Sequence, residues 1–167
     1  MLAQDVMVRQ VHTVAPDMTV TELADFLREK AISGAPVVDQ RGDLLGVVST
    51  TDLLLHAPWD GETYRTERNL YQSEGFWIDL DLLKKRLRST DHSLRVRDIM
   101  TATCYHVDET TPLHTVIYLM DLKSVHRIIV TREQRRVVGI ITSMDLVRYL
   151  GTLVQPPSPT FRTPSCE

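Results

Sequence analysis

Two short motifs in this chain carry the same pair of oxygen-bearing side chains at the same spacing. Ser49 lies three residues before Asp52, and Thr142 lies three residues before Asp145. A hydroxyl at the start of a helix lies among free backbone amides that favour a phosphate, and an ionised carboxylate offers two oxygens to hydroxyl groups. Because the same spacing forms a capping box that stabilises a helix without any ligand, the motifs indicate either a binding site or two helix caps.

The two motifs belong to a longer internal repeat. Asp145 follows Asp52 by 93 residues, and the same offset aligns Gly46 with Gly139 and residues 5–7 with residues 98–100. A repeat held in register over about 50 residues indicates two copies of one folding unit. Any site in one copy must therefore be compared with the matching place in the other.

The first copy is expected to contain strand, helix, strand, strand and helix. The predicted strands are residues 11–14, 35–38 and 44–48, and the last is continuously apolar, which favours burial on both faces. Thr19 begins a capping box for the first helix, and the second helix begins near Asp52.

The second copy repeats this order. Thr111 is expected to cap a helix whose first residue is Pro112, and Gly151 is expected to end the closing helix. The predicted strands are residues 105–107, 128–131 and 137–141, the closing helix is 144–150, and short helical lead-ins at 4–7 and 96–100 precede the two copies.

The repeat divides the chain into four segments. The copies occupy residues 1–56 and 95–151. Residues 57–94 form an insertion rich in aromatic residues, with a predicted amphipathic helix. Residues 152–167 are rich in proline, serine and threonine, a composition that predicts disorder.

Composition excludes several classes of protein. The 167 residues are 43% hydrophobic and 25% charged, as in soluble globular proteins. A net charge of −3 without a basic cluster argues against nucleic acid, and no apolar run suits a membrane span. The six histidines lack metal-ligand spacing, and Cys104 is expected to be a buried thiol. We expect a cytoplasmic protein, or one in an equivalent organelle stroma or matrix.

These residues resemble the cystathionine β-synthase (CBS) domain family, whose tandem pair is called a Bateman module. The resemblance rests on the two Asp-x-Met lead-ins, on residues 34–39, and on two Gly-x-x-Ser/Thr-x-x-Asp motifs in register. It implies an α/β fold in which two βαββα units pack through their sheets and leave two clefts. The aromatic-rich insert also resembles stand-alone CBS-pair proteins of plants and bacteria.

The resemblance also implies the roles of the site residues. It assigns Asp52 and Asp145 to a ribose and the motif hydroxyls to phosphate, with small residues near an adenine ring. Arg127 is either a phosphate contact or a surface charge. No catalytic or metal-binding residue is expected, and the expected ligand-binding residues are Thr13, Gly34, Ala35, Pro36, Ser49, Asp52, His106, Arg127, Ile128, Thr142 and Asp145.

The function implied is regulation and not catalysis. The family suggests a sensor that binds AMP, ADP or ATP, needs no cofactor, and signals to an unidentified protein partner. A homodimer is expected through the helices that carry Leu23 with Leu27 and Val116 with Met120, and through the closing helices. The alternatives are S-adenosylmethionine or a cyclic dinucleotide as ligand, a regulatory subunit of an enzyme or transporter, or a scaffold with empty clefts.

Overall fold

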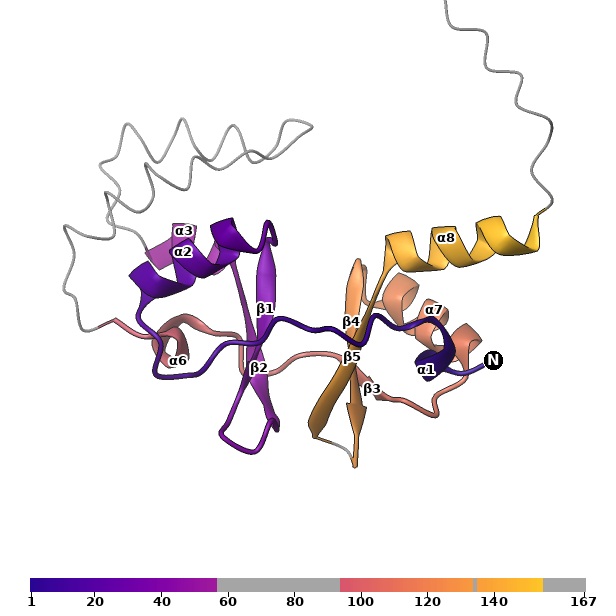
Figure 1. Ribbon diagram of the computed structural model, residues 1–167, viewed down its shortest axis with the longest axis horizontal. Coiled ribbons are helices and arrows are strands. Elements are labelled where there is room, and N and C mark those ends of the chain that lie inside the picture. Colours follow the sequence, from indigo (N-terminus) through magenta and orange to yellow (C-terminus); the bar gives the residue numbers. More distant parts are fainter. Residues whose placement is uncertain (57–93, 134, 155–167) are drawn as a thin grey trace, which may run out of the picture.

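The computed structural model describes residues 1–56, 94–133 and 135–154. Nearly all of the insertion, and the tail from residue 155 on, lie outside these residues, and so do the helix and most of the disorder predicted there. The described chain forms two halves, each a small sheet with helices on its outer side, and the two sheets lie towards the middle of the molecule (Figure 1). The predicted α/β fold of two tandem units is confirmed.

The first half consists of an antiparallel strand pair and two helices. Its elements are α2 (Val20–Glu29), β1 (Gly34–Val38), β2 (Leu44–Ser49) and α3 (Thr50–His56). The helix α2 begins with the predicted capping box, in which Thr19 Oγ1 accepts the amide of Glu22 at 3.2 Å and the Glu22 carboxylate accepts the amide of Thr19 at 2.9 Å. The buried Leu23 and Leu27 of α2 belong to the core of this half.

The second half has the same order with one more strand. Its elements are β3 (His106–Asp108), α7 (Leu113–Leu122), β4 (Arg127–Arg132), β5 (Arg136–Thr142) and α8 (Ser143–Leu153). Strand β3 runs parallel to β4, and β4 runs antiparallel to β5. The predicted strand and helix positions in this half are therefore confirmed to within a few residues.

The strand predicted at residues 11–14 is reduced to a single bridge. Val14 pairs with Val37, donating to the Pro36 carbonyl at 3.0 Å and accepting from the Val38 amide at 3.0 Å. The next bond of a parallel ladder would need an amide hydrogen from Pro36, which proline lacks. Ile129 occupies the matching position in the second half, and there the ladder with β3 forms.

Other predictions made from local patterns were also wrong. Strand β2 is not buried on both faces, because Gly46 and Val48 point to the core while Leu45 is 37% exposed. Thr111 does not cap α7: Pro112 occupies the N-cap position, and the Thr111 carbonyl accepts the amide of Ala3 at 2.8 Å. Gly151 lacks the positive φ of a helix-ending glycine, and α8 continues to Leu153, into the segment predicted to be disordered.

The two lead-in helices are exchanged between the halves. Helix α1 (Ala3–Val6) packs against β5 and α8 of the second half, whereas α6 (Val96–Ile99) contacts α3 of the first (Figure 1). Buried Val96 and Ile99 belong to the first core, and buried Ala3 belongs to the second. Neither copy as defined by the sequence is therefore complete, since each core is closed by the lead-in of the other.

The chain that follows each lead-in pairs with the opposite sheet. Val8 and Ile140 exchange two backbone hydrogen bonds of 2.9 and 3.0 Å, and Thr101 and Val47 exchange two of 2.9 and 3.0 Å. The motif glycine Gly46 lies directly against this crossing segment: a Cβ added at Gly46 would lie 2.5 Å from the Thr101 carbonyl oxygen.

We expect Gly46→Ala to destabilise the protein by about 1–3 kcal/mol, as overpacking against backbone does. Gly139→Ala is the matched control, because its Cβ would meet the Met7 Sδ at 2.3 Å, and a flexible methionine side chain can move aside. Urea denaturation should therefore give a larger loss for Gly46→Ala than for Gly139→Ala. Equal losses would show that the crossing segment at Thr101 yields as easily as a side chain.

Candidate functional site

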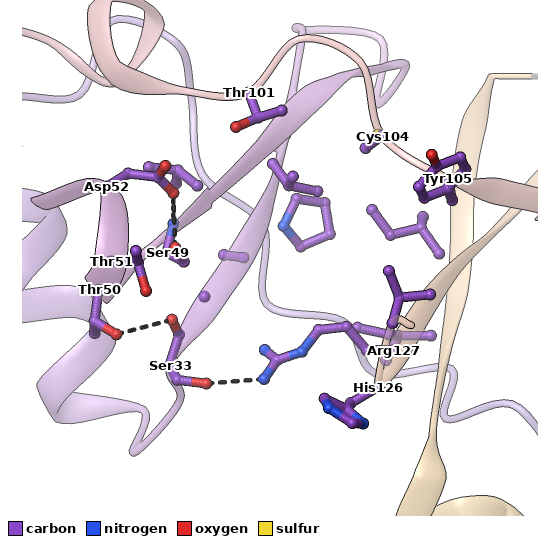
Figure 2. A pocket seen from close by; sticks show the side chains of 18 of the residues that line it. Ser33, Ser49, Thr50, Thr51, Asp52, Thr101, Cys104, Tyr105, His126 and Arg127 are labelled. Carbon is purple, nitrogen blue, oxygen red and sulfur yellow. Dashed lines mark hydrogen bonds between the residues drawn. The ribbon is translucent and has the colours of Figure 1, made fainter. Parts of the chain in front are cut away.

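A cleft with a cavity volume of about 880 Å³ opens between the two halves. One wall comes from the first half, namely the start of β1 and the junction of β2 with α3. The rest of the lining comes mainly from the crossing segment, which lies beside β2 at Thr101 and reaches the second half at Tyr105, and from the start of β4 (Figure 2). The volume lies within the range of small-molecule sites. A ligand in this cleft would contact both halves at once.

The carboxylate of Asp52 lies on the first-half wall of the cleft. Its Oδ2 accepts hydrogen bonds from the Ser49 amide at 2.7 Å and from the Ser49 hydroxyl at 2.7 Å (Figure 2). Among the described residues, no hydrogen bond reaches the second oxygen, Oδ1. The cap and the binding site are therefore compatible, because one oxygen holds the helix start while the other can accept a hydroxyl of a ligand.

Asp145 carries the same cap but a different second contact. Its Oδ2 accepts the Thr142 amide at 2.8 Å and the Thr142 hydroxyl at 2.6 Å. Its Oδ1 lies 3.2 Å from Nη1 of Arg148, and its side chain is 9% exposed. Leu55 occupies the position that matches Arg148 in the first half. The two copies of the motif thus differ, since Asp145 is already paired with a cation.

Arg127 reaches across the cleft from the second half to the first. Its Nη2 donates a hydrogen bond of 2.9 Å to the hydroxyl of Ser33 (Figure 2). Ser49 and Thr50 line the cleft on the same side as Ser33. A guanidinium beside several hydroxyls is an arrangement that suits a phosphate. Arg127 is therefore a residue of the cleft and not an isolated surface charge.

The structure brings together only part of the predicted site. The residues in the lining of the cleft are Gly34, Ala35, Pro36, Ser49, Asp52 and Arg127. Ile128 lies in the core at 1% exposed. Thr13, His106, Thr142 and Asp145 are not among the lining residues, and the His106 ring lies on the exposed surface with Nδ1 3.4 Å from the Cys104 carbonyl oxygen.

Sequence reasoning missed the wall formed by the crossing segment. The lining also includes Thr101, Thr103, Cys104 and Tyr105 of this segment, together with His126. The available signal was the lead-in motif just before Thr101, but each lead-in was assigned to its own copy. Cys104 was expected to be a buried thiol, but it is only partly buried and lines the cleft, and this partial burial raises the pKa of its thiol.

In residues 1–56, 94–133 and 135–154, no three side chains of His, Cys, Asp or Glu gather in a way that would hold a metal ion. Within the same ranges, no helix is both long and apolar enough to cross a membrane.

Comparison with known proteins agrees with this geometry. CBSX1, a chloroplastic CBS domain-containing protein of Arabidopsis thaliana, is 33% identical over 139 residues, which are 83% of this chain and 58% of CBSX1. The crystal structure of CBSX2 from A. thaliana has a TM-score of 0.68 at 26% identity, covering 91% of this chain and 95% of that one. A structure of CBSX2 in complex with AMP has a TM-score of 0.65 at 27% identity, covering 91% and 97%.

The match to the family itself extends over both repeats. The chain spans 58% of the length of both CBSX1 and CBSX2. The family model of the CBS domain matches residues 3–58 and 96–152. The two matched segments contain the two halves of the structure and the motifs that flank the cleft. The chain therefore belongs to the CBS domain family and carries two CBS domains that pair into one unit.

Proposed function

We propose that this protein binds one adenine nucleotide in the cleft between its halves and passes its ligand state to a protein partner. The proposal rests on two groups that line the same cavity. One is the Oδ1 of Asp52, which accepts no hydrogen bond among the described residues, and the other is the guanidinium of Arg127. The binding of AMP by CBSX2, a structural relative at 27% identity, supports the choice of ligand.

The cleft suggests how each part of a nucleotide would be held. The ribose hydroxyls would donate to Asp52, and the phosphate would lie between Arg127 and the hydroxyl of Ser33. The base would lie against the small residues 34–36, where the backbone is accessible, and against the crossing segment. Each contact uses a group that already lines the cavity.

The second motif is proposed not to form an equivalent site. The ion pair with Arg148 uses the Asp145 oxygen that would accept a ribose hydroxyl. At the position of Gly34, the second half has the bulky Arg127, whose side chain reaches into the first cleft. We therefore propose one nucleotide per chain.

Ligand binding is proposed to change how the two halves sit together. In the structure described, Arg127 and Ser33 join the halves directly across the cleft. A phosphate would take over both groups, so the ligand would favour whichever arrangement of the halves fits it. A change in the arrangement of the halves could be recognised by a protein partner, so the ligand state would be transmitted without any catalytic step. We propose that the protein acts in the cytoplasm or an equivalent organelle stroma.

The direct test is calorimetry with AMP, ADP, ATP, S-adenosylmethionine and cyclic di-AMP. We expect one site per chain and preferential binding of an adenine nucleotide. AMP at about 100 times its Kd should then stabilise the fold by roughly 2.7 kcal/mol, which is visible as a thermal shift. If only S-adenosylmethionine or only the cyclic dinucleotide binds, that compound is the ligand in place of an adenine nucleotide. If none of the compounds binds, the result favours a scaffold with empty clefts. Turnover of a nucleotide by the purified protein would contradict the non-catalytic role.

We also propose a homodimer. Of the surfaces first predicted, the closing helices remain candidates, since Met144, Val147 and Leu150 of α8 are exposed, whereas the apolar stripes of α2 and α7 do not. Leu23, Leu27, Val116 and Met120 are each at most 6% exposed and fill the two cores. They cannot contact a second copy, because the helical pattern that suggested a dimer face is the pattern of the core. Sedimentation equilibrium at tens of micromolar should give a mass near twice 19.1 kDa.

A further inference from the structure

The cleft carries little charge for its size. Of the described residues in its lining, Asp52 is the one acidic side chain, and Arg127 and His126 are the basic ones. Arginine is charged at every physiological pH, whereas histidine is the side chain that changes its charge near neutrality. Apart from these three, the lining is apolar or carries hydroxyl and thiol groups. A ligand with several negative charges would therefore meet one carboxylate and one guanidinium.

The start of α3 offers few further donors to an anion. The amide and the hydroxyl of Ser49 both donate to Oδ2 of Asp52 at 2.7 Å, and the amide of Thr50 donates to the Ser33 carbonyl at 3.0 Å. Free amides of this kind are what allow a helix start to bind an anion. Here these groups would have to leave their partners in the protein before they could bind a second phosphate.

The nearby cations outside the lining are also engaged. Nζ of Lys123 lies 5.4 Å from the centroid of the Tyr105 ring, and Arg148 pairs with Asp145 at 3.2 Å. Arg127 is thus the lining cation that reaches across the cleft, where it meets the hydroxyl of Ser33 (Figure 2). A planar guanidinium forms paired hydrogen bonds with one phosphate group. The cleft can therefore match the charge of a single phosphate.

From this distribution of charge we infer that the cleft selects a nucleoside 5′-monophosphate over the corresponding diphosphate and triphosphate. The inference rests on the proposed nucleotide site and specifies the number of phosphates that the site accepts. Size does not make the selection, because a cavity of about 880 Å³ is near the upper end of the range for small-molecule sites. The additional phosphates of ATP would bring negative charge close to the Asp52 carboxylate without a cation to meet it, and unmatched like charges oppose binding.

Calorimetry on the full chain with AMP, ADP and ATP, at pH 8 and without divalent cations, tests the selection. We expect ATP to bind roughly ten-fold or more weakly than AMP, with ADP between them, because its extra charges lose hydration without gaining a partner. Adding Mg²⁺ at constant ionic strength should narrow this difference, since the metal neutralises part of the charge of ATP without making it smaller. A difference that Mg²⁺ leaves unchanged would show that charge is not the cause.

Two substitutions of one residue separate the added charge from the changed side chain. Ser33 is exposed at the edge of the cleft. Ser33→Lys and Ser33→Gln both remove the hydroxyl that accepts from Arg127, but only lysine adds a cation. The ratio of the Kd for ATP to the Kd for AMP should fall roughly ten-fold in Ser33→Lys, as a charge-assisted contact to the additional phosphates allows. In Ser33→Gln, the matched control, this ratio should stay close to that of the wild type.

The outcomes distinguish the inference from the proposed function. If AMP, ADP and ATP all fail to bind, the proposed nucleotide site is wrong and this inference falls with it. If AMP binds and ATP binds as tightly, only the selection by phosphate number is wrong. If Ser33→Gln lowers the ratio as much as Ser33→Lys, the side chain of Ser33 limits ATP binding, and the missing cation does not.

Discussion

Asp52→Ala is expected to weaken nucleotide binding roughly ten- to a hundred-fold, which corresponds to about 1.5–3 kcal/mol for a lost hydrogen-bonding carboxylate. The reason is the unshared Oδ1 of Asp52, which lines the cleft while Oδ2 accepts from Ser49. Calorimetry with AMP on wild type and variant measures the change directly.

Asp145→Ala is the matched control for this variant. Both aspartates cap a helix through a hydroxyl three residues earlier, so both substitutions should cost about 1 kcal/mol of folding stability. Only Asp52→Ala should change affinity, because Asp145 is paired with Arg148 outside the cleft lining. If both variants melt lower and both bind AMP as tightly as wild type, Asp52 is a helix cap and no more.

Arg127→Ala is expected to lower the affinity for AMP about ten- to a hundred-fold, since a charge-assisted contact to phosphate is lost. Adenosine has no phosphate, so its affinity should change little. The comparison of the two ligands separates a phosphate contact from a general loss of the site. Arg127→Lys should restore only part of the affinity, because lysine keeps the charge but not the planar pair of donors.

Arg136→Ala controls for the contact between the halves. Arg136 also joins the second half to the first, since its Nη2 donates to the Arg41 carbonyl at 2.9 Å, but it does not line the cleft. Its removal should leave affinity for both ligands unchanged. An equal loss of AMP affinity in Arg127→Ala and Arg136→Ala would mean that Arg127 acts by holding the halves together and not by contacting phosphate.

The sequence by itself determined the repeat, most secondary structure and the local form of the motifs. The capping boxes at Thr19 and Thr142 depend on side chains three residues apart, so they can be read from spacing alone. The same is true of the apolar positions of α2, which became the core. Such features depend on neighbours along the chain, and spacing alone therefore predicts them.

The tertiary structure alone decided which copy completes which core and what lines the cleft. The exchange of α1 and α6 brings Thr101 and Tyr105 into the cleft that Asp52 lines, although no local pattern states which half a lead-in will join. Likewise, Arg127 reaches across the cleft to the hydroxyl of Ser33, which lies 94 residues earlier in the chain. These features arise from contacts between residues far apart in the sequence, whose pairing is fixed by packing and not by spacing.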